Sequence, residues 1–326
     1  MSLDPARAAV RLAVRPHLRT PARVLVACSG GPDSLALLAA TVFEAHAEGV
    51  VVVGATVDHG LQEGSADRAA EVVAQMAALG VDETATIRVT VDPGPAGIEA
   101  GARDARYAAL GQLAQNLGAD LVLVGHTLDD QAETVLLGLA RGSGGRALQG
   151  MRPSFVEDGV SFVRPLLGLR RTDTEAACRA EGLDWWEDPH NRDPRFTRSR
   201  VRHTVMPVLE RELGPGIAQA LARTADQVRD DLEVVDREVD RLHAGVVDAD
   251  GGLDLDRLGE SVEHALVTRV VRRAAIEAGA IASELTRDHV LAILRTFDGP
   301  RKEIQLPGHL TAYRDGTVLR FRPTSR

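Results

Sequence analysis

Along the N-terminal part of the chain, short β-branched and aliphatic runs alternate with longer stretches in which apolar residues recur at helical spacing. The short runs predict buried strands and the longer stretches predict helices. Strands are expected at 24–26, 50–57, 84–91 and 121–124, and helices at 35–48, 65–79 and 98–117. Ser65 is the expected N-cap of the second helix. Alternating strands and helices predict a doubly wound parallel sheet with right-handed crossovers, an α/β fold.

The C-terminal part has a different pattern. A helix is expected at 172–181, and a long amphipathic helix at 217–242 carries an apolar seam with acidic residues between. Helices at 262–278 and 287–296 and strands at 303–306 and 318–321 follow. We therefore expect a first domain over 1–215, a linker helix over 216–245 and a small α+β domain over 246–326.

A glycine pair stops the apolar pattern where the first strand ends. Glycines let the backbone turn with no Cβ near a bound group, and proline next favours a helix start, whose free N–H groups suit phosphate oxygens. The segment reads Ser29, Gly30, Gly31, Pro32, Asp33, Ser34. Asp33 could hold Mg²⁺ beside the phosphates. Lys302 is the only lysine, so this is not a Walker A loop. An ordinary βα turn is the weaker alternative.

Polar residues also follow two later strands. Asp58 and His59 come after the second strand, and Gly125 and His126 after the fourth. The carboxyl ends of parallel strands are where such sheets place their ligands. Three acids follow at the start of the next helix: Asp129, Asp130 and Glu133. Capping and compensation of the helix dipole explain one or two of these acids, so we interpret the segment as a catalytic edge.

Arginines form two further groups. Arg103 and Arg106 share a helix face with Glu99 and could neutralise a phosphate, although a surface ion pair is an alternative. Arg141 begins a glycine-rich loop over 141–146. Five arginines lie within 192–202, opposed there by a single acid, Asp193. Such a local positive segment suits an RNA backbone better than it suits a merely solvated helix face.

Composition narrows these interpretations. The chain has 326 residues, 44% hydrophobic and 26% charged, and no apolar run long enough to span a bilayer. Its first residues suit a surface helix better than a signal peptide, so we expect a cytoplasmic protein without membrane contact. Cys28 and Cys178 are far apart, which argues against a disulfide framework, a zinc ribbon or an iron–sulfur cluster. The net charge of −9 makes the arginine segment the local exception.

The segment 29–34 resembles the pyrophosphate-binding loop of the ATP pyrophosphatase (PP-loop) superfamily, whose members adenylate a carbonyl or ureido oxygen. Within it, the segments 58–61, 125–134 and 141–144 are similar to signatures of the tRNA(Ile)-lysidine synthetases. The arginine segment resembles that family too, with His190 and Ser199 as departures from its pattern. The resemblance covers roughly the first two-thirds of the chain.

This resemblance implies an enzyme that uses ATP and Mg²⁺ to join free L-lysine to the wobble cytidine of tRNA(Ile) with a CAU anticodon. Asp33 and Asp129 would hold metal. Asp129, Asp130 and Glu133 would share the roles of metal binding, amine binding and proton acceptance in an order that the sequence leaves open. The implied catalytic group is completed by His126, Arg103 and Arg106. The implied ATP-binding residues are Ser29, Gly30, Gly31, Pro32, Asp33, Ser34, Asp58, His59 and Gly125. The implied tRNA-binding residues are Arg141, Asn191, Arg195, Arg198, Arg200 and Arg202.

Three alternatives stay open at this point. A tRNA thiolation enzyme of the same superfamily would want a cysteine pair, which this chain lacks. A small-molecule adenylating synthetase would need ammonia and a different C-terminal domain. A nucleotide-binding regulatory module would not need the three acids. The sequence leaves the oligomeric state open, with a homodimer among the alternatives, and we expect the C-terminal domain to contact tRNA.

Overall fold

The computed structural model describes residues 4–58, 60, 64–90, 98–142, 144–260, 263–296 and 303–324. The chain divides into two compact units, Met1–Val228 and Arg229–Arg326. The division falls inside one long helix, α10 (Ile217–Val246).

The first unit is built on a six-stranded sheet of order β3-β2-β1-β4-β6-β5. Its strands are β1 (Arg23–Ala27), β2 (Val51–Asp58), β3 (Glu83–Arg88), β4 (Leu121–Val124), β5 (Ser154–Glu157) and β6 (Val160–Val163). All neighbours pair in parallel except β5, which is antiparallel to β6. The predicted parallel α/β sheet is therefore confirmed. The β5–β6 hairpin was not predicted, because its strands are short and β5 is largely exposed, so they lack the apolar run that marks the equally short β4.

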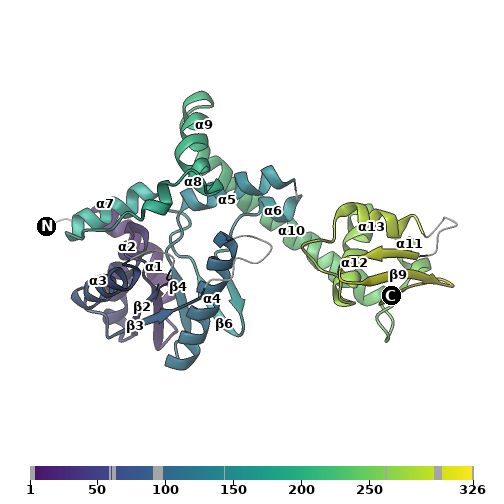
Figure 1. Ribbon diagram of the computed structural model, residues 1–326, viewed down its shortest axis with the longest axis horizontal. Helices are drawn as coiled ribbons and strands as arrows, with labels where there is room; N and C mark the ends of the chain where they lie inside the picture. The colour runs from purple at the N-terminus through teal and green to yellow at the C-terminus, as the bar shows by residue number, and fades with distance from the viewer. Residues whose placement is uncertain are drawn as a thin grey trace. The chain divides into compact units, whose positions relative to one another are not determined.

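Helices cover both faces of this sheet (Figure 1). Those before the arginine segment are α1 (Pro5–Val14), the short η1 (Arg15–His17), α2 (Pro32–Glu48), α3 (Ser65–Ala78), α4 (Ile98–Leu117), α5 (Leu128–Arg141), α6 (Gly145–Leu148) and α7 (Arg171–Glu181). The segment after α7 forms η2 (Pro189–Arg192), α8 (Thr197–Arg200), the π-helical turn η3 (Val201–Val205) and α9 (Met206–Glu212). The α2 helix starts three residues before the predicted 35–48.

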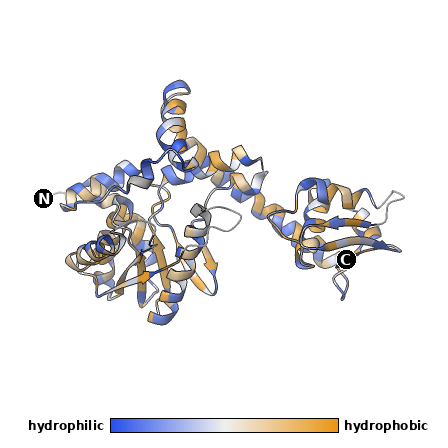
Figure 2. Cartoon of the chain, in the orientation of Figure 1, coloured by the Kyte–Doolittle hydropathy of each residue, from blue (hydrophilic) through white to orange (hydrophobic). Residues whose placement is uncertain are grey.

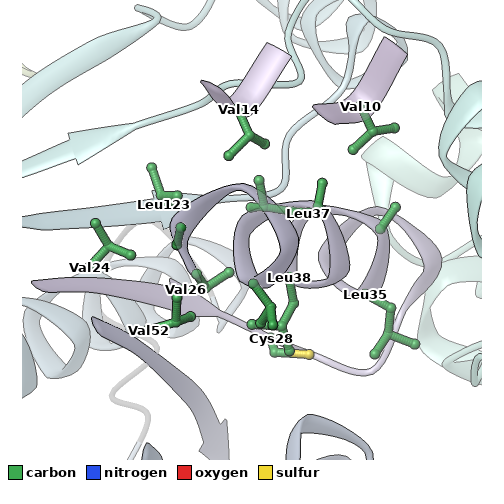
Figure 3. Close-up of a cluster of buried hydrophobic side chains, with 14 of the residues drawn as sticks. Val10, Val14, Val24, Val26, Cys28, Leu35, Leu37, Leu38, Val52 and Leu123 are labelled. Atoms are coloured by element: carbon green, nitrogen blue, oxygen red, sulfur yellow. The ribbon is translucent and has the colours of Figure 1, made fainter. Parts of the chain in front are cut away.

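Side-chain alternation along the strands divides the core into two layers. Val24 and Val26 of β1 pack with α1, α2 and α7, whereas Leu25 between them packs with α4. Figure 3 shows Val24, Val26 and Leu37 in the first layer. In the first unit, hydrophobic residues dominate the central strands, and the helices carry both kinds of residue (Figure 2). Because both faces of the central strands β1, β2 and β4 are buried, these strands read as the continuous apolar runs noted in the sequence.

Two details of the sequence prediction are wrong. Gly64, with a φ of 78°, is the N-cap of α3, and Ser65 is its first helical residue. A left-handed backbone at this position favours glycine, so the serine is displaced into the helix. The third strand ends at Arg88, before residue 91.

The second unit contains a four-stranded antiparallel sheet of order β7-β10-β9-β8. Its elements after α10 are β7 (Leu253–Asp254), α11 (Leu255–Gly259), α12 (His264–Glu277), α13 (Arg287–Leu294), β8 (Glu303–Leu306), β9 (Leu310–Asp315) and β10 (Val318–Pro323). The predicted helices and the strands at 303–306 and 318–321 are present, while β7 and β9 were not predicted. None of the helices in the described part of the chain combines the length and apolar character that a membrane span requires.

Candidate active site

The loop between β1 and α2 is shaped for close approach. Gly30 has a φ of 78°, and a Cβ there would lie 2.7 Å from the side chain of Val72. Gly31 is the N-cap of α2 and offers no side chain to the helix N–H groups. The Ser34 hydroxyl braces the loop, since it accepts from the Ser29 amide at 3.1 Å and donates to the Gly31 carbonyl at 2.9 Å. The loop thus presents a rigid helix N-terminus that can receive an anion.

The end of β4 lies directly against this loop. A Cβ on Gly125 would stand 3.0 Å from the Asp33 carbonyl oxygen, so glycine allows the two segments to touch. Because β1 has β2 on one side and β4 on the other, the contact lies where the chain order of the sheet reverses. This is the place where doubly wound sheets bind their ligands.

A first cavity of about 440 Å³ opens beside the loop. Its walls include apolar residues of β1 and β2, with Asp58 at the end of β2. Arg68 stacks over the ring of Trp186 at 4.6 Å, and both side chains line this cavity. The Trp186 amide donates to the Gly30 carbonyl at 3.1 Å, which ties the segment after α7 to the loop. We call this space the apolar cavity; the candidate His59 lies outside the described residues.

A second cavity of about 770 Å³ adjoins the first. The two share five lining residues, namely Ser29, Ser34, Arg106, Gly125 and His126. The rest of the second wall is strongly charged and includes Asp33, Arg103, Asp130, Arg171, Asn191, Arg195, Arg198 and Arg202. We call it the charged cavity. The phosphate-type loop therefore stands between an apolar space and a charged one.

Asp130 serves the fold and the site at once. Its Oδ2 accepts from the amide and hydroxyl of Thr127 at 2.9 and 3.0 Å, forming a capping box at the start of α5. Its Oδ1 accepts from Arg171 and Arg202 at 3.1 and 3.0 Å. Burial alone would raise the pKa of Asp130, but the surrounding arginines hold it well below the ordinary value of 3.8. The carboxylate is therefore ionised throughout the physiological range.

Glu133 is 1% exposed and is enclosed by the arginine segment. It accepts from Arg198 Nε at 2.9 Å and from Arg202 Nε at 2.6 Å. Around these hydrogen bonds, apolar side chains of α5 pack against Val201 of η3 and Met206 of α9. The sequence assigns Glu133 to the amine or its proton and the two arginines to tRNA, but in the structure these side chains bind each other. Their pairing could not be predicted, because they are distant in sequence and meet only on folding.

Asp33 lies at the start of α2 and faces α7. It accepts from Arg171 Nε at 3.1 Å and from the Thr174 hydroxyl at 2.5 Å. Burial raises the pKa of Asp33, and the negative charge of Asp130 adds to this effect. The positive charge of Arg171 acts in the opposite direction but does not cancel it. A further cation near Asp33 would therefore stabilise its ionised form.

Arg171 is a site residue that the sequence analysis missed. Its guanidinium bonds to Asp33 and Asp130, and it lies 3.9 Å from Glu133. Burial by itself would lower the pKa of Arg171, and the three carboxylates raise it above its ordinary value. A signal existed in the sequence, since Arg170 and Arg171 start a helix where the dipole disfavours cations.

Asp129 points elsewhere. It accepts from Arg170 Nε at 3.1 Å and from the Arg171 amide at 2.8 Å, which fastens α5 to the start of α7. It is not among the described residues that line either of the two cavities. Asp33 and Asp130 are the carboxylates that the structure brings to the charged cavity.

Arg103 and Arg106 surround Tyr107 together with a third arginine, Arg164 of the segment after β6. Their guanidinium carbons lie 5.1, 5.6 and 6.0 Å from the ring centre of Tyr107. Burial lowers the pKa of Arg106 and of Arg164. Burial also lowers the pKa of His126 well below 6.5, so its imidazole is neutral.

The candidate tRNA-binding residues are divided by the fold. Asn191, Arg195, Arg198 and Arg202 line the charged cavity, whereas Arg141 and Arg200 are exposed and are not in its described lining. Arg195 is 81% exposed at its side chain and pairs with Asp193. Arg198 and Arg202 are only 24% and 22% exposed at theirs. The positive segment is thus partly an open surface and partly the wall of the cavity.

A magnesium ion is compatible with this donor set. The described residues contain no cluster of three or more His, Cys, Asp or Glu side chains arranged to hold a metal alone. Mg²⁺ commonly binds through one or two carboxylates together with substrate phosphates, so a full protein cage is not required. Asp33, with its raised pKa beside the loop, meets that requirement.

Comparisons with known proteins agree with this arrangement. The PP-loop domain family matches residues 5–209. The tRNA(Ile)-lysidine synthase of Streptomyces coelicolor is 49% identical over 94% of this chain and 87% of its own length. The tRNA(Ile)-lysidine synthase of Thermobifida fusca is 48% identical over 97% of each chain. The U34-tRNA thiolase NcsA from Methanococcus maripaludis, with 18% identity and a TM-score of 0.56 over 68% of this chain and 78% of its own, shares the fold. The chain belongs to the tRNA(Ile)-lysidine synthase family, and its first unit carries the PP-loop domain.

Proposed function

We propose that this protein is an ATP-dependent ligase that attaches free L-lysine to C2 of the wobble cytidine of tRNA(Ile) with a CAU anticodon. The observation that carries the proposal is the pair of adjoining cavities that share the phosphate-type loop as a wall. An adenylating enzyme needs this arrangement, because the nucleotide must present its α-phosphate to a second substrate in a neighbouring space.

The reaction has two steps. First, O2 of the cytidine attacks the α-phosphorus of ATP, the bond to the β-phosphate breaks, and pyrophosphate leaves. The ε-amine of lysine then attacks C2, the C2–O bond breaks, AMP leaves with that oxygen, and the amine loses a proton. Adenylation makes a poor leaving group into a good one, so ATP cleavage drives the substitution.

The apolar cavity would hold the nucleoside of ATP, and the loop from Ser29 to Ser34 would hold its phosphates through N–H groups. Arg103 and Arg106 would stabilise negative charge at the α-phosphate. Mg²⁺, held by Asp33 with Asp130 as a second carboxylate, would reduce repulsion between Asp33 and the phosphates. Arg171 also supplies positive charge between Asp33 and Asp130.

The charged cavity would receive lysine and the target cytidine. Lysine carries both a carboxylate and amines, and this wall offers arginines and carboxylates of matching charge. Asp130 is ionised and reaches the cavity, and it would bind an ammonium group in exchange for one of its arginine partners. Glu133 would accept a proton or bind the amine only after Arg198 and Arg202 release it. The exposed Arg195 would contact tRNA phosphates.

The burial of the two cysteines argues against a thiolation reaction in this chain. Cys28 and Cys178 are both buried, and burial raises the pKa of each thiol, to about 12 for Cys178. A thiol that stays protonated is a poor nucleophile and a poor metal ligand. The double variant Cys28→Ala, Cys178→Ala should therefore keep its activity in the lysine assay.

The test is incorporation of radiolabelled lysine into a tRNA(Ile) transcript with ATP and Mg²⁺, with AMP and pyrophosphate counted as products. We expect one lysine per transcript, and no label in a matched transcript in which uridine replaces the wobble cytidine. Equal labelling of the two transcripts would contradict the assignment of the acceptor base. Absence of lysine labelling by active, folded enzyme, together with incorporation of ammonia or sulfur, would overturn the proposal.

A further inference from the structure

Arg164 is a buried cation held by neutral groups. It is 6% exposed, and no ion pair to it occurs among the residues whose side chains the structure describes. Its guanidinium donates to the Arg152 carbonyl at 2.6 Å, to the Tyr107 hydroxyl at 3.0 Å and to His126 Nδ1 at 3.3 Å. A buried charge without a carboxylate is costly, so such an arrangement calls for a functional reason.

The contact of Arg164 with His126 gives a functional reason for the buried charge. A guanidinium is always protonated and can only donate, so His126 Nδ1 must act as the acceptor in this bond. A neutral imidazole carries a single ring proton, which must then reside on Nε2. The neighbouring charges of Arg106 and Arg164 also disfavour a second proton on the ring. The tautomer of His126 is thereby fixed by its neighbour.

The position of His126 makes its tautomer important for the site. His126 belongs to the wall shared by the apolar and the charged cavity, next to Gly125 and the loop. An Nε2–H group at this wall is a donor at the junction where the proposed reaction places the α-phosphate and the cytidine oxygen. The opposite tautomer would present a lone pair to the same anionic groups, which is repulsive.

We infer that Arg164 is a positioning residue for the adenylation step: it holds His126 as the Nε2–H tautomer, so that the imidazole donates a hydrogen bond toward the α-phosphate or the attacking oxygen. The inference rests on the proposed function for the identity of the acceptor. The assignment of the tautomer rests only on the Arg164–His126 contact. Arg164 also lies over Phe155 at 4.4 Å, within a cluster that includes Phe162. Its three hydrogen bonds orient the guanidinium plane.

The first test needs no variant. Two-bond proton–nitrogen correlation spectra of enzyme labelled with ¹⁵N-histidine distinguish protonated from unprotonated ring nitrogens, and the spectrum of His126→Gln identifies the signals of His126. At neutral pH we expect His126 Nε2 to carry the proton and Nδ1 to be unprotonated. A proton on Nδ1, or on both nitrogens, would overturn the inference whatever the substrate of the enzyme proves to be.

The second test compares Arg164→Met with Phe155→Leu. The methionine removes all three donors, and we expect mixed tautomers at His126 and a fall of about 10- to 100-fold in kcat of tRNA-dependent ATP–pyrophosphate exchange, with the KM for ATP unchanged. Phe155→Leu alters the packing but leaves the donors, so the His126 signals and the exchange should persist. Unchanged His126 signals in folded Arg164→Met would overturn the role.

A third variant separates charge from geometry. Arg164→Lys keeps a cation but cannot reproduce three bonds from one planar group. We expect it to fold as the wild type does and to restore kcat only in part. Full activity in Arg164→Lys together with unaltered His126 signals would mean that charge alone suffices, which contradicts positioning through the Nε–H group. Absence of lysine transfer by the wild-type enzyme, together with the expected tautomer of His126, would count against the proposed function and leave the tautomer assignment standing.

Discussion

Two groups of three arginines approach this site, and they differ in what surrounds them. Arg171, Arg198 and Arg202 bind the carboxylates of Asp130 and Glu133. Arg103, Arg106 and Arg164 pack around Tyr107, and the described side chains offer them no ion pair. The first group is electrostatically satisfied by the protein itself. The second leaves positive potential at the wall that the two cavities share, where an anion would complete it.

This difference separates structural charge from charge reserved for substrate. A paired arginine stabilises the assembled site, and its removal exposes buried carboxylates to one another. Arg103 and Arg106 pack on an aromatic ring, line the charged cavity and remain available to phosphate. Arg164 is buried and acts on the site through His126. The same residue type therefore predicts loss of stability in one group and loss of catalysis in the other.

The largest effect is expected for Asp33→Asn, which removes the charge of a carboxylate that pairs with Arg171 and lines the charged cavity. Removal of the charge should lower Mg²⁺-dependent ATP–pyrophosphate exchange by at least about a hundredfold, because a metal ligand beside the phosphates is lost. The thermal stability of the protein, in contrast, should not fall. Since the pKa of Asp33 is raised in the fold, its ionised form is disfavoured there, and the neutral amide should not lower the midpoint of thermal unfolding. Unchanged exchange would remove Asp33 from the metal site.

A large stability effect is expected for Arg171→Met in the carboxylate-paired group. Three carboxylates would lose a common cation, and breaking a buried pair costs about 3 to 5 kcal/mol of unfolding free energy. Urea unfolding would measure the loss. The matched control is Arg179→Met, whose exposed side chain pairs with Glu175 and should change stability by less than about 1 kcal/mol. Equal losses in the two variants would refute the distinction.

The same variant has a defined pH dependence. The folded pKa of Asp130 lies below its ordinary value of 3.8, so its contribution to stability is present above that value and is lost as the pH falls through the folded pKa. Without Arg171 the folded pKa should rise toward 3.8, and the loss should begin at higher pH. Unfolding free energies measured from about pH 6 down to about pH 2 should show the variant failing first. Parallel acid limbs would argue against the charge coupling.

A moderate effect on binding is expected for Arg195→Ala, which lies outside the buried pairs. It should lower tRNA affinity and reduce the slope of log affinity against log salt by about one, without changing stability. Arg202→Met should instead reduce stability, because it leaves Glu133 short of a partner. Filter binding across a salt series, with Arg179→Ala as the control, distinguishes the two. An unchanged slope in Arg195→Ala would identify its segment as a solvated surface.

The smallest effect is expected for Trp186→Phe, which probes the apolar cavity. The chain has two tryptophans, so intrinsic fluorescence can report on each by removal of the other. ATP should change the emission of Trp186, which lines the cavity with Arg68. The response should therefore persist in Trp185→Phe and disappear in Trp186→Phe. A response carried by Trp185 would place the nucleotide elsewhere.

The parallel sheet and the loop at its carboxyl edge could both be predicted from the amino-acid sequence. Uninterrupted apolar runs require burial on both faces, and the glycine pair before Pro32 needs the turn it makes, so local sequence suffices for both. The acids after β4 and the arginine segment were also visible as local clusters. The short β5–β6 hairpin was not, because an edge hairpin of eight strand residues has little periodicity of its own.

The pairing of the charged side chains could be seen only in the folded protein. Arg198 and Glu133 are 65 positions apart, and Arg164 and His126 are 38 apart, so no local spacing relates them. Their contacts depend on the packing of α5 against the arginine segment and of β4 beside β6. Electrostatic interactions act between neighbours in space and leave no period in the chain, whereas hydrophobic burial does. The scaffold could therefore be predicted from the sequence, while the pairing of its charges required the fold.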